Sequence, residues 1–325
     1  METVLVTGAA GFVGGHLLRA LARTDSPTTI VAWRRPDGAE SPGAATPRKL
    51  PAGARVRWQG VDILDRAHVG RAIARLRPRE IYHCVGAAVV GRSWERTARP
   101  LEVHVRGTQI LLEAVAAARP AARILIPGSG LVYRPSTGAV AEDHPLGPVS
   151  PYGLSKLAQE MLGRQCADDG LDVLLTRSFT HLGPGQAPAY AASSFARQIA
   201  RIEAGASPPV IEVGALDARR DLTDVRDVVR AYRGLMARGR PGRAYNVCSG
   251  RAHRIGDVLD ELLRRTDARV TVRVDPDRLR PRDHDVLLGN PARINEEIGW
   301  RPGIPLAETL RDLLRYWRQV VRSQA

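Results

Sequence analysis

Tyr152 and Lys156 carry side chains that could perform proton chemistry, and a Tyr and a Lys four residues apart share one face of a helix. A buried ammonium beside a phenol favours the phenolate, so we expect the pKa of Tyr152 to lie below its ordinary value of about 10. Such a phenol can act as general acid or base on an alcohol or a ketone. Lys49 and Lys156 are the only lysines among 48 basic residues. With 7 tyrosines in 325 residues, the chance that either lysine follows a Tyr by four positions is roughly 0.04, which favours a chemical role.

A glycine-rich turn follows a short apolar strand over residues 3–6 and precedes a helix over residues 16–23. Glycines let the backbone turn tightly and approach a ligand closely, while the N–H groups at a helix start attract phosphate. The alternative is a plain connection between strand and helix, which the position after the first strand disfavours. We predict that this turn binds the pyrophosphate of a dinucleotide through Gly8, Gly11, Phe12, Val13 and Gly14.

The second predicted strand, residues 29–33, ends in Arg34 and Arg35. An acidic residue at this point usually binds the ribose hydroxyls of NAD, whereas an arginine accommodates a 2′-phosphate. The pair therefore favours NADP(H) over NAD(H) as the cofactor, although two arginines could stand here by accident in so Arg-rich a chain.

The next two strands, residues 56–60 and 80–85, also end in residues that could face a cofactor. Asp62 could accept a hydrogen bond from an adenine amino group beside the Ile63 backbone, or it could cap the helix that starts near residue 66. Small residues at the end of a strand leave room for a flat ligand. After the fourth strand we expect contacts to the cofactor from Val85, Gly86 and Ala87.

Strands and helices alternate along the chain at intervals of about 25 residues, which indicates βαβ units and a parallel sheet. A fifth strand at residues 123–126 leads to Ser129. Sixth and seventh strands are expected at residues 171–176 and 245–248, with the last one returning to the main sheet. Two long helices are expected, one over residues 100–118 and one that starts at Ser150 and Pro151, with an apolar face of Leu154, Leu157, Ala158, Met161 and Leu162. The fold class is α/β, a Rossmann-type doubly wound parallel sheet with a smaller C-terminal lobe.

Composition limits the setting of the protein. The net charge of +14 is spread along the chain without a basic run, and aromatic residues make up only 5%, so we expect no nucleic-acid partner. Cys84, Cys166 and Cys248 fit neither a disulfide framework nor a metal site. We expect a cytoplasmic protein with reduced cysteines, no bound metal and no membrane segment.

With these elements in order, the chain resembles an extended short-chain dehydrogenase/reductase of the NAD-dependent epimerase/dehydratase family over nearly its full length. It is similar to the GDP-mannose 4,6-dehydratases and more closely to the GDP-4-keto-6-deoxy-mannose reductases, which form GDP-rhamnose. Arg34 and Arg35 match NADP-binding arginines of the dehydratases. The other segments that carry the resemblance are residues 177–186 (RSFTHLGPGQ), 219–225 (RRDLTDV), 245–250 (YNVCSG) and 280–290.

The resemblance implies the roles of the site residues. Ser129, Tyr152 and Lys156 form the catalytic set, and Tyr152 and Lys156 also contact the cofactor, with His181 near the nicotinamide. The substrate contacts implied are Ser129, Thr180, Gln186, Arg220 and Arg280. A 4,6-dehydratase has a carboxylate where this chain has Leu131, and a GDP-fucose synthase has a Cys where it has Gly130. The minimal set that remains implies NAD(P)H-dependent reduction of the C4 ketone of a nucleoside-diphosphate 4-keto-6-deoxy sugar.

The chain departs from the family pattern at three positions and leaves other functions open. His104 and Thr180 each replace an Asn, and Arg134 replaces a Gly. The alternatives are a nucleotide-sugar 4-epimerase that retains NAD and a catalytically silent NADP-binding sensor. We expect residues 1–178 and about 220–250 to bind the dinucleotide, residues of about 179–219 and 251–325 to bind the nucleotide sugar, and helices near 100–118 and 151–166 to form a homodimer.

Overall fold

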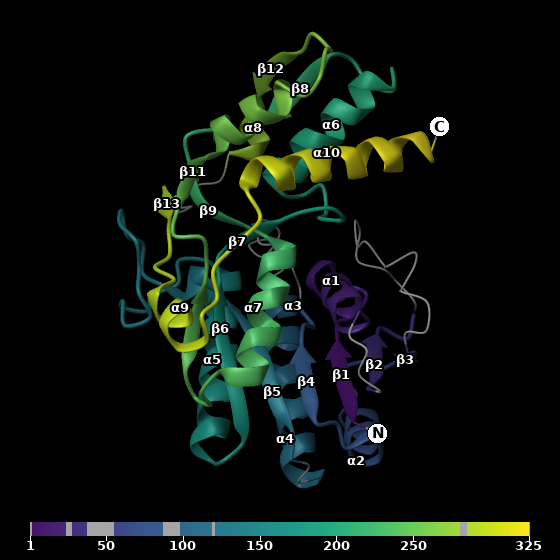
Figure 1. Cartoon of the computed structure of the whole chain (residues 1–325), viewed down its shortest axis with the longest axis vertical. Coiled ribbons are helices and arrows are strands. Elements are labelled where there is room, and N and C mark those ends of the chain that lie inside the picture. The colour runs from purple at the N-terminus through teal and green to yellow at the C-terminus, as the bar shows by residue number, and fades with distance from the viewer. Residues whose placement is uncertain are drawn as a thin grey trace.

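Seven parallel strands form the central sheet of the computed structural model, which describes residues 2–23, 28–37, 55–86, 98–118, 121–279 and 285–324 (Figure 1). Every neighbouring pair in this sheet is parallel. In spatial order the strands are β10 (Ala244–Val247), β6 (Asp172–Ser178), β5 (Arg123–Ser129), β4 (Glu80–His83), β1 (Thr3–Thr7), β2 (Thr29–Arg34) and β3 (Val56–Gly60). The predicted fold class is confirmed, and the strand near residue 245 does return to the main sheet.

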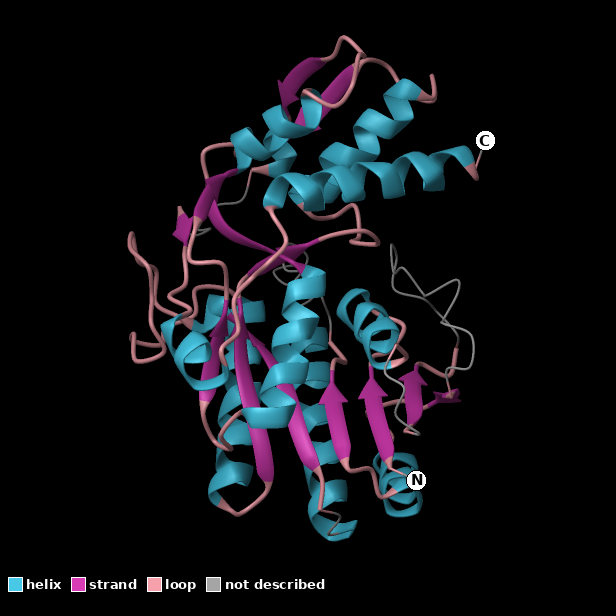
Figure 2. Cartoon of the chain, in the orientation of Figure 1, coloured by secondary structure: helices cyan, strands magenta, loops and turns pink. Residues whose placement is uncertain are grey.

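The strand order reverses between β1 and β4. From β1 the chain proceeds outward through β2 and β3, and from β4 it proceeds the other way through β5, β6 and β10. The strands point toward the smaller lobe (Figure 2). Open α/β sheets bind ligands beyond the carboxyl ends of the strands at such a reversal, so the site is expected between the two lobes above β1 and β4.

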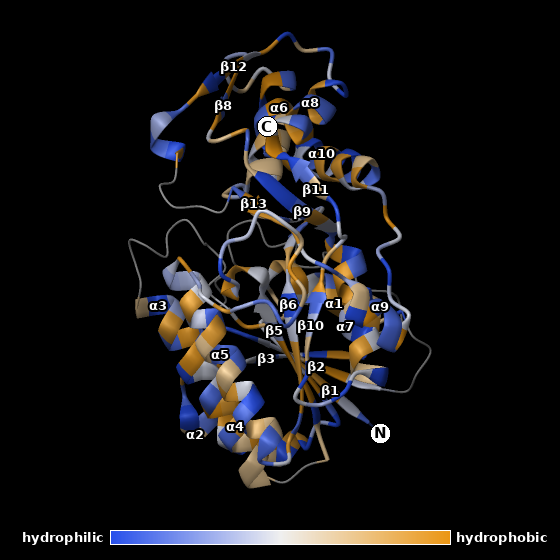
Figure 3. Cartoon of the chain, turned by 90° about the vertical axis from the view of Figure 1, so that its left-hand side faces the viewer, coloured by the Kyte–Doolittle hydropathy of each residue, from blue (hydrophilic) through white to orange (hydrophobic). Residues whose placement is uncertain are grey.

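Helices cover both faces of the sheet because successive strand residues point to opposite sides. Val4 and Val6 of β1 belong to one apolar core, whereas Leu5 belongs to the other. The strands of the central sheet are accordingly coloured largely as hydrophobic, in orange, in Figure 3. The first core is covered by α1 (Phe12–Leu21), α7 (Val225–Arg238) and α9 (Ala292–Ile298), and the second by α2 (Arg66–Leu76), α4 (Gly107–Ala118) and α5 (Pro151–Asp168).

Helix α5 turns a polar face toward the sheet, which the sequence analysis did not anticipate. Two residues of its predicted apolar face, Leu154 and Met161, are 53% and 63% exposed. The buried positions of α5 are Gly153, Ser155, Lys156, Gln159, Glu160 and Gly163. The expected apolar stripe therefore lies partly on the outer surface, since residues with polar or absent side chains fill the inner face.

The predicted helix over residues 100–118 is interrupted by a wider turn. It comprises α3 (Ala98–Leu101), the π-helical segment η2 (Glu102–Arg106) and α4. Single π-helical turns inside helices occur frequently at functional sites. Among the described residues, no helix has the length and apolarity needed to cross a membrane.

The smaller lobe holds short strands that periodicity did not reveal, in addition to its helices (Figures 1 and 2). Its core is formed by residues such as Phe195, Ile199, Leu259, Leu313 and Trp317. The strands are β7 (Thr180–Leu182), β9 (Arg219–Asp224), β11 (Ala252–Arg254) and β13 (Val286–Leu287) in one sheet, and β8 (Val210–Val213) and β12 (Thr271–Val274) in a separate pair. The helical elements are α6 (Ala191–Glu203), α8 (Ile255–Leu263), α10 (Leu306–Arg322) and the 3₁₀ turn η4 (Pro276–Arg278).

Candidate active site

The glycine turn is held tightly between the ends of β1 and β4. Gly8 has a positive φ of 63°, and a Cβ on it would lie 2.6 Å from the carbonyl oxygen of Cys84. A Cβ on Gly14 would lie 2.3 Å from the oxygen of Gly8. Helix α1 begins at Phe12 after Gly11, which provides no side-chain cap, so the first N–H groups of the helix remain available to an anion. This cradle fits the pyrophosphate of a dinucleotide.

Arg34 and Arg35 lie exposed at the end of β2. The guanidinium carbon of Arg34 lies 5.7 Å from the ring centroid of Trp58 on β3, which is cation–π geometry. Arg35 pairs with Asp37 at 3.6 Å. Both cations stand at the edge where the adenosine end of a dinucleotide would lie if its pyrophosphate occupied the glycine turn.

One of the two interpretations of Asp62 is wrong. Helix α2 is capped by Asp65, whose carboxylate accepts a hydrogen bond from the backbone N–H of His68 at 2.9 Å. Asp62 is exposed and accepts from the N–H of Leu64 at 3.0 Å. Its neighbour Ile63 is buried. The carboxylate of Asp62 is thus accessible to a ligand and is not needed as a helix cap.

The strand end at β4 is described only in part. Val85 is half-buried and Gly86 is exposed. A Cβ on Gly86 would lie 2.9 Å from Nε2 of His104. Ala87 and Arg280, two of the predicted contact residues, lie outside the described residues.

Ser129 and Tyr152 are positioned by one tight contact between two elements. Ser129 ends β5 and accepts a hydrogen bond from the N–H of Leu131 at 3.2 Å, which caps the 3₁₀ turn η3 (Gly130–Val132). A Cβ on Gly153 would lie 2.5 Å from the oxygen of Leu131. The start of α5, capped by Ser150, therefore presses against the turn that carries Ser129, with Tyr152 in its first helical turn.

Lys156 is buried, and its ammonium is bound by neutral groups. It donates to the carbonyl oxygen of Pro127 at 2.9 Å and to Oε1 of Gln159 at 2.8 Å. It forms no ion pair with any described residue. Burial lowers the pKa of Lys156 to about 8. Burial also raises the pKa of Tyr152 above its ordinary value, so the expected lowering by the lysine is wrong for this arrangement of side chains.

His104, in the π-helical segment, supports Tyr152. The two rings meet edge to face, with centroids 5.5 Å apart. Ser155 Oγ donates to the backbone oxygen of Tyr152 at 2.7 Å, and it lies 2.9 Å from Nδ1 of His104. Burial, with a smaller contribution from the Lys156 charge, lowers the pKa of His104 to about 2. This neutral imidazole occupies the position at which the family pattern has an Asn.

The residue predicted near the nicotinamide, His181, and two predicted substrate contacts, Thr180 and Gln186, lie on and after β7. His181 stacks on Phe12 with centroids 6.0 Å apart, and it hydrogen-bonds the oxygen of Phe179 at 3.0 Å. Burial lowers its pKa. Gln186 is buried, and its amide donates to the backbone oxygen of His181 at 2.8 Å, so it supports β7 directly. Thr180 is partly exposed beside it.

The arginine predicted for the diphosphate lies in the smaller lobe. Arg220 is partly exposed on β9 and donates to the oxygens of Arg219 and Asp285 at 2.9 Å and 3.4 Å. Gly130, directly after Ser129, is packed against the ring of Phe179, to which an added Cβ would approach within 3.1 Å. The turn after Ser129 therefore has little room for a side chain at residue 130.

Sequence reasoning missed an ion pair that joins α5 to β6. Arg177 and Glu160 are both buried, and they form a bidentate pair with distances of 2.6 Å and 2.9 Å. Arg177 also donates to the hydroxyl of Tyr133 at 2.9 Å. Glu160 lies four residues after Lys156, so it shares the inner face of the helix with that lysine. This spacing was the signal in the sequence that could have indicated a buried carboxylate.

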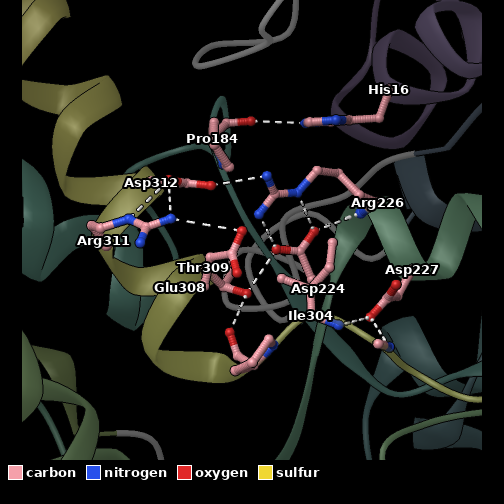
Figure 4. A network of polar contacts seen from close by, with 12 residues as sticks. His16, Pro184, Asp224, Arg226, Asp227, Ile304, Glu308, Thr309, Arg311 and Asp312 are labelled. Atoms are coloured by element: carbon pink, nitrogen blue, oxygen red, sulfur yellow. Dashed lines mark hydrogen bonds and ion pairs between the residues drawn. The ribbon is translucent and has the colours of Figure 1, made fainter.

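Sequence reasoning also missed the polar contacts that join the two lobes (Figure 4). Arg226 of α7 binds Asp224 at 2.7 Å and Asp312 of α10 at 2.9 Å. The hydroxyl of Thr309 donates to Asp224 at 2.7 Å. His16 of α1 contacts the oxygen of Pro184 at 2.9 Å, which attaches the helix of the glycine turn to the loop after β7. These contacts fix the smaller lobe over the carboxyl ends of the strands.

Comparison with known proteins shows similarity over nearly the whole chain. The family model for GDP-mannose 4,6 dehydratase matches residues 5–313. The GDP-6-deoxy-D-mannose reductase of Pseudomonas aeruginosa is 33% identical over 327 residues, which cover 99% of each chain. The structure of RMD from Pseudomonas aeruginosa complexed with NADPH has 31% identity and a TM-score of 0.84, and covers 98% of this chain and 100% of that chain.

A third similar protein performs a different reaction. The UDP-glucose 4-epimerase of Thermus thermophilus, in a complex with NAD, has 26% identity and a TM-score of 0.82, and the match covers 98% of this chain and 99% of that chain. The family resemblance in the sequence is confirmed: this chain belongs to the GDP-mannose 4,6 dehydratase family of extended short-chain dehydrogenases/reductases.

Proposed function

We propose that the protein reduces the C4 ketone of a nucleoside-diphosphate 4-keto-6-deoxy sugar, of the GDP-4-keto-6-deoxy-mannose type, with NAD(P)H as reductant. The observation that carries this proposal is the turn after Ser129. Leu131 has no acid–base group, and Gly130 is packed against Phe179 where a catalytic Cys would stand. The similarity to a GDP-6-deoxy-D-mannose reductase over 99% of both chains supports the same reaction class.

In the proposed mechanism Tyr152 is the general acid and Ser129 stabilises the developing charge. A bound nicotinamide supplies the hydride that C4 receives. The Tyr152 phenol donates its proton to the C4 oxygen, and the Ser129 hydroxyl hydrogen-bonds the same oxygen. The raised pKa of Tyr152 keeps the phenol protonated before reaction, which is the form that a general acid requires.

Lys156 would complete the catalytic set by holding the nicotinamide ribose and compensating the phenolate that proton donation leaves behind. Lys156 is a buried residue of α5, the helix that also carries Tyr152. His181 and Thr180 would line the site from β7, with Gln186 behind them. Arg220 and Arg280 are proposed to bind the diphosphate through charge-assisted hydrogen bonds.

The cofactor-binding residues would be the glycine cradle, Asp62 and Ile63 near the adenine, and Val85 to Ala87 along the strand end. Arg34 and Arg35 support NADP(H) over NAD(H), and the NADPH complex of the Pseudomonas aeruginosa protein agrees.

Losing a charge-assisted hydrogen bond costs about 1.5–3 kcal/mol, so Arg35→Ala should raise the KM for NADPH about 10- to 100-fold. The KM for NADH should change little, and Arg57→Ala, on the exposed side of β3, is the matched control.

We further propose the division of labour that the sequence suggests. Residues 1–178 and about 220–250 would bind the dinucleotide, while about 179–219 and 251–325 would bind the nucleotide sugar. A homodimer is supported by the exposed apolar side chains on the outer helices, namely Leu101, Leu154 and Met161, which are 40%, 53% and 63% exposed. A cytoplasmic location is consistent with the three free cysteines.

The test is to incubate the protein with GDP-, dTDP-, UDP- and CDP-linked 4-keto-6-deoxy sugars and to follow NADPH absorbance. We expect consumption of one NADPH per sugar with one nucleotide preferred, and the same nucleotide should raise the melting temperature most. If none of these sugars consumes NADPH, the reductase is rejected. Interconversion of the corresponding nucleotide-linked 4-hydroxy sugars, assayed in parallel, would then establish the 4-epimerase, the reaction named for the Thermus thermophilus neighbour.

A further inference from the structure

Five buried side chains form a continuous hydrogen-bonded chain from Lys156 to the end of β1. Lys156 Nζ donates to Gln159 Oε1 at 2.8 Å, and Gln159 Nε2 donates to Thr108 Oγ1 at 2.7 Å. Thr108 Oγ1 lies 3.0 Å from Nε2 of His83, whose Nδ1 lies 2.9 Å from Thr7 Oγ1. Thr7, Thr108 and Gln159 are completely buried, and the next residue after Thr7 is the glycine of the cofactor turn.

The hydrogen bonds of this chain can all run in one direction. The two unambiguous donors, the ammonium and the Gln159 amide, both point away from Lys156. Thr108 accepts from Gln159, so its own hydroxyl proton can go to Nε2 of His83, which leaves the imidazole proton on Nδ1 to reach Thr7. Burial lowers the pKa of His83 to about 3, with a smaller contribution from Lys156, which keeps this imidazole neutral. With the His83 proton on Nδ1, each group presents its negative end toward the ammonium.

No carboxylate compensates the ammonium within the described residues. The titratable groups that face Lys156 are His83 and Cys84 from β4, His104 from the π-helical segment, and His181 from β7. The neighbouring acid Glu160 binds Arg177. The charge of Lys156 consequently depends on two acceptors, the Pro127 carbonyl and the Gln159 amide.

We infer that Gln159 is a positioning residue for the reaction: it holds the Lys156 ammonium in place and in its charged form, and it is itself fixed by the chain through Thr108 and His83 to Thr7. The link to catalysis rests on the proposed function of Lys156. The link to the lysine's charge does not, because it concerns only the free protein. One pathway of contacts thus joins the catalytic lysine to the strand that carries the glycine turn.

The test measures the protonation of Lys156 directly. Because Lys49 is the only other lysine, a Lys49→Arg protein labelled with ¹³Cε-lysine gives a single lysine signal, whose pH titration reports Lys156. Gln159→Met keeps the side-chain length and removes the acceptor. A hydrogen bond to a charged group contributes about 1.5–3 kcal/mol, so the titration midpoint should fall by about one to two pH units.

Gln159→Glu is the opposite variant. It places a carboxylate within reach of the ammonium, so the midpoint should rise by about one to three pH units. The matched controls are Gln165→Met and Gln165→Glu, which change an exposed residue of the same helix and should leave the midpoint unchanged. If the methionine variant does not fold, the glutamate variant still decides the question.

The inference is overturned if both folded Gln159 variants titrate as the parent does. It is supported if the two midpoints move in opposite directions. If the protein is an active reductase, the pH at which kcat/KM decreases on the alkaline side should shift in the same direction as each titration midpoint. If Gln159 had only a structural role, its replacement would lower the melting temperature and leave that pH unchanged. Shifted titrations without reduction of any 4-keto sugar would retain this inference and reject the proposed function.

Discussion

Replacing Arg177 by methionine should destabilise the protein strongly, because it removes the partner of a buried carboxylate. Arg177 and Glu160 are 2% and 3% exposed and share two short hydrogen bonds. After Arg177→Met the remaining described cation near Glu160 is Arg164, which is 3.5 Å away and 49% exposed. Arg177 also stacks on Tyr133, 4.8 Å from its ring centroid, so its loss also loosens the segment after Ser129.

The magnitude follows from the burial of the pair. Breaking a buried ion pair by removing one partner costs about 3–5 kcal/mol, since the other charge is left without compensation. The double variant Arg177→Met, Glu160→Met removes both charges. It leaves the Tyr133 hydroxyl and the Glu142 carbonyl, which Arg177 binds, without a donor. At about 1 kcal/mol for each hydrogen bond, it should cost about 2 kcal/mol, less than the single change.

The assay is urea denaturation of the parent and variants, compared with an exposed pair of similar length. Arg273 and Glu212 are also 2.6 Å apart, but Arg273 is 65% exposed, so Arg273→Met should cost less than about 1 kcal/mol. The reasoning is refuted if Arg177→Met costs no more than Arg273→Met, or if the double variant is less stable than the single one. Either result would show that burial does not determine the strength of this pair.

Two further predictions concern acid and packing. Burial lowers the pKa of His16, His83 and His104 to about 4, 3 and 2. As the pH falls, these histidines are therefore protonated in the unfolded chain before they are protonated in the folded protein. The free energy of unfolding should consequently decrease below about pH 6.5, by up to about 2 kcal/mol for each histidine at pH 5. Equal denaturation midpoints at pH 7 and pH 5 would contradict this. Gly130→Ala should cost about 1–3 kcal/mol by overpacking against Phe179, 3.1 Å from the new Cβ; a variant as stable as the parent would show that the ring moves aside freely.

The local patterns in the sequence were sufficient to predict the sheet and the elements that carry the candidate catalytic residues. The glycine turn, the Tyr152–Lys156 spacing and the strand that ends at Ser129 each lie within a few residues, and the structure positions them on the expected elements. The strand near residue 245 was recognisable because Tyr245, Val247 and Cys248 form a short, mostly apolar run, as is typical of buried parallel strands. These features needed no knowledge of distant contacts.

The remaining features depend on contacts between distant residues. Gln159 bonds Thr108 across 51 positions, and Thr7 contacts His83 across 76. No periodicity reports such a pairing, and because the inner face of α5 is polar, part of its expected apolar stripe lies on the outer surface. Three strands of the smaller lobe, β7, β11 and β13, were missed because they span only 3, 3 and 2 residues, too few for an alternation to appear.

The Tyr152 pKa shows the same limit. Spacing on a helix predicts that a tyrosine and a lysine share a face, but it does not predict what else the lysine binds. In the structure the ammonium is bound by Pro127 and Gln159, and burial raises the pKa of Tyr152. The direction of a pKa shift therefore had to be taken from the folded environment.

The central claim, hydride transfer to C4 of a 4-keto sugar with Tyr152 as the acid, is tested most directly by isotope transfer. NADPH carrying deuterium at both C4 positions of the nicotinamide is incubated with GDP-4-keto-6-deoxy-mannose, and the product sugar is examined by NMR. We predict one deuterium at C4 of the sugar for each NADPH oxidised, a rate at least 10²-fold lower for Tyr152→Phe, and an unchanged rate for Tyr316→Phe in the smaller lobe. A sugar that turns over without acquiring deuterium, or a Tyr152→Phe protein with full activity, would contradict the account.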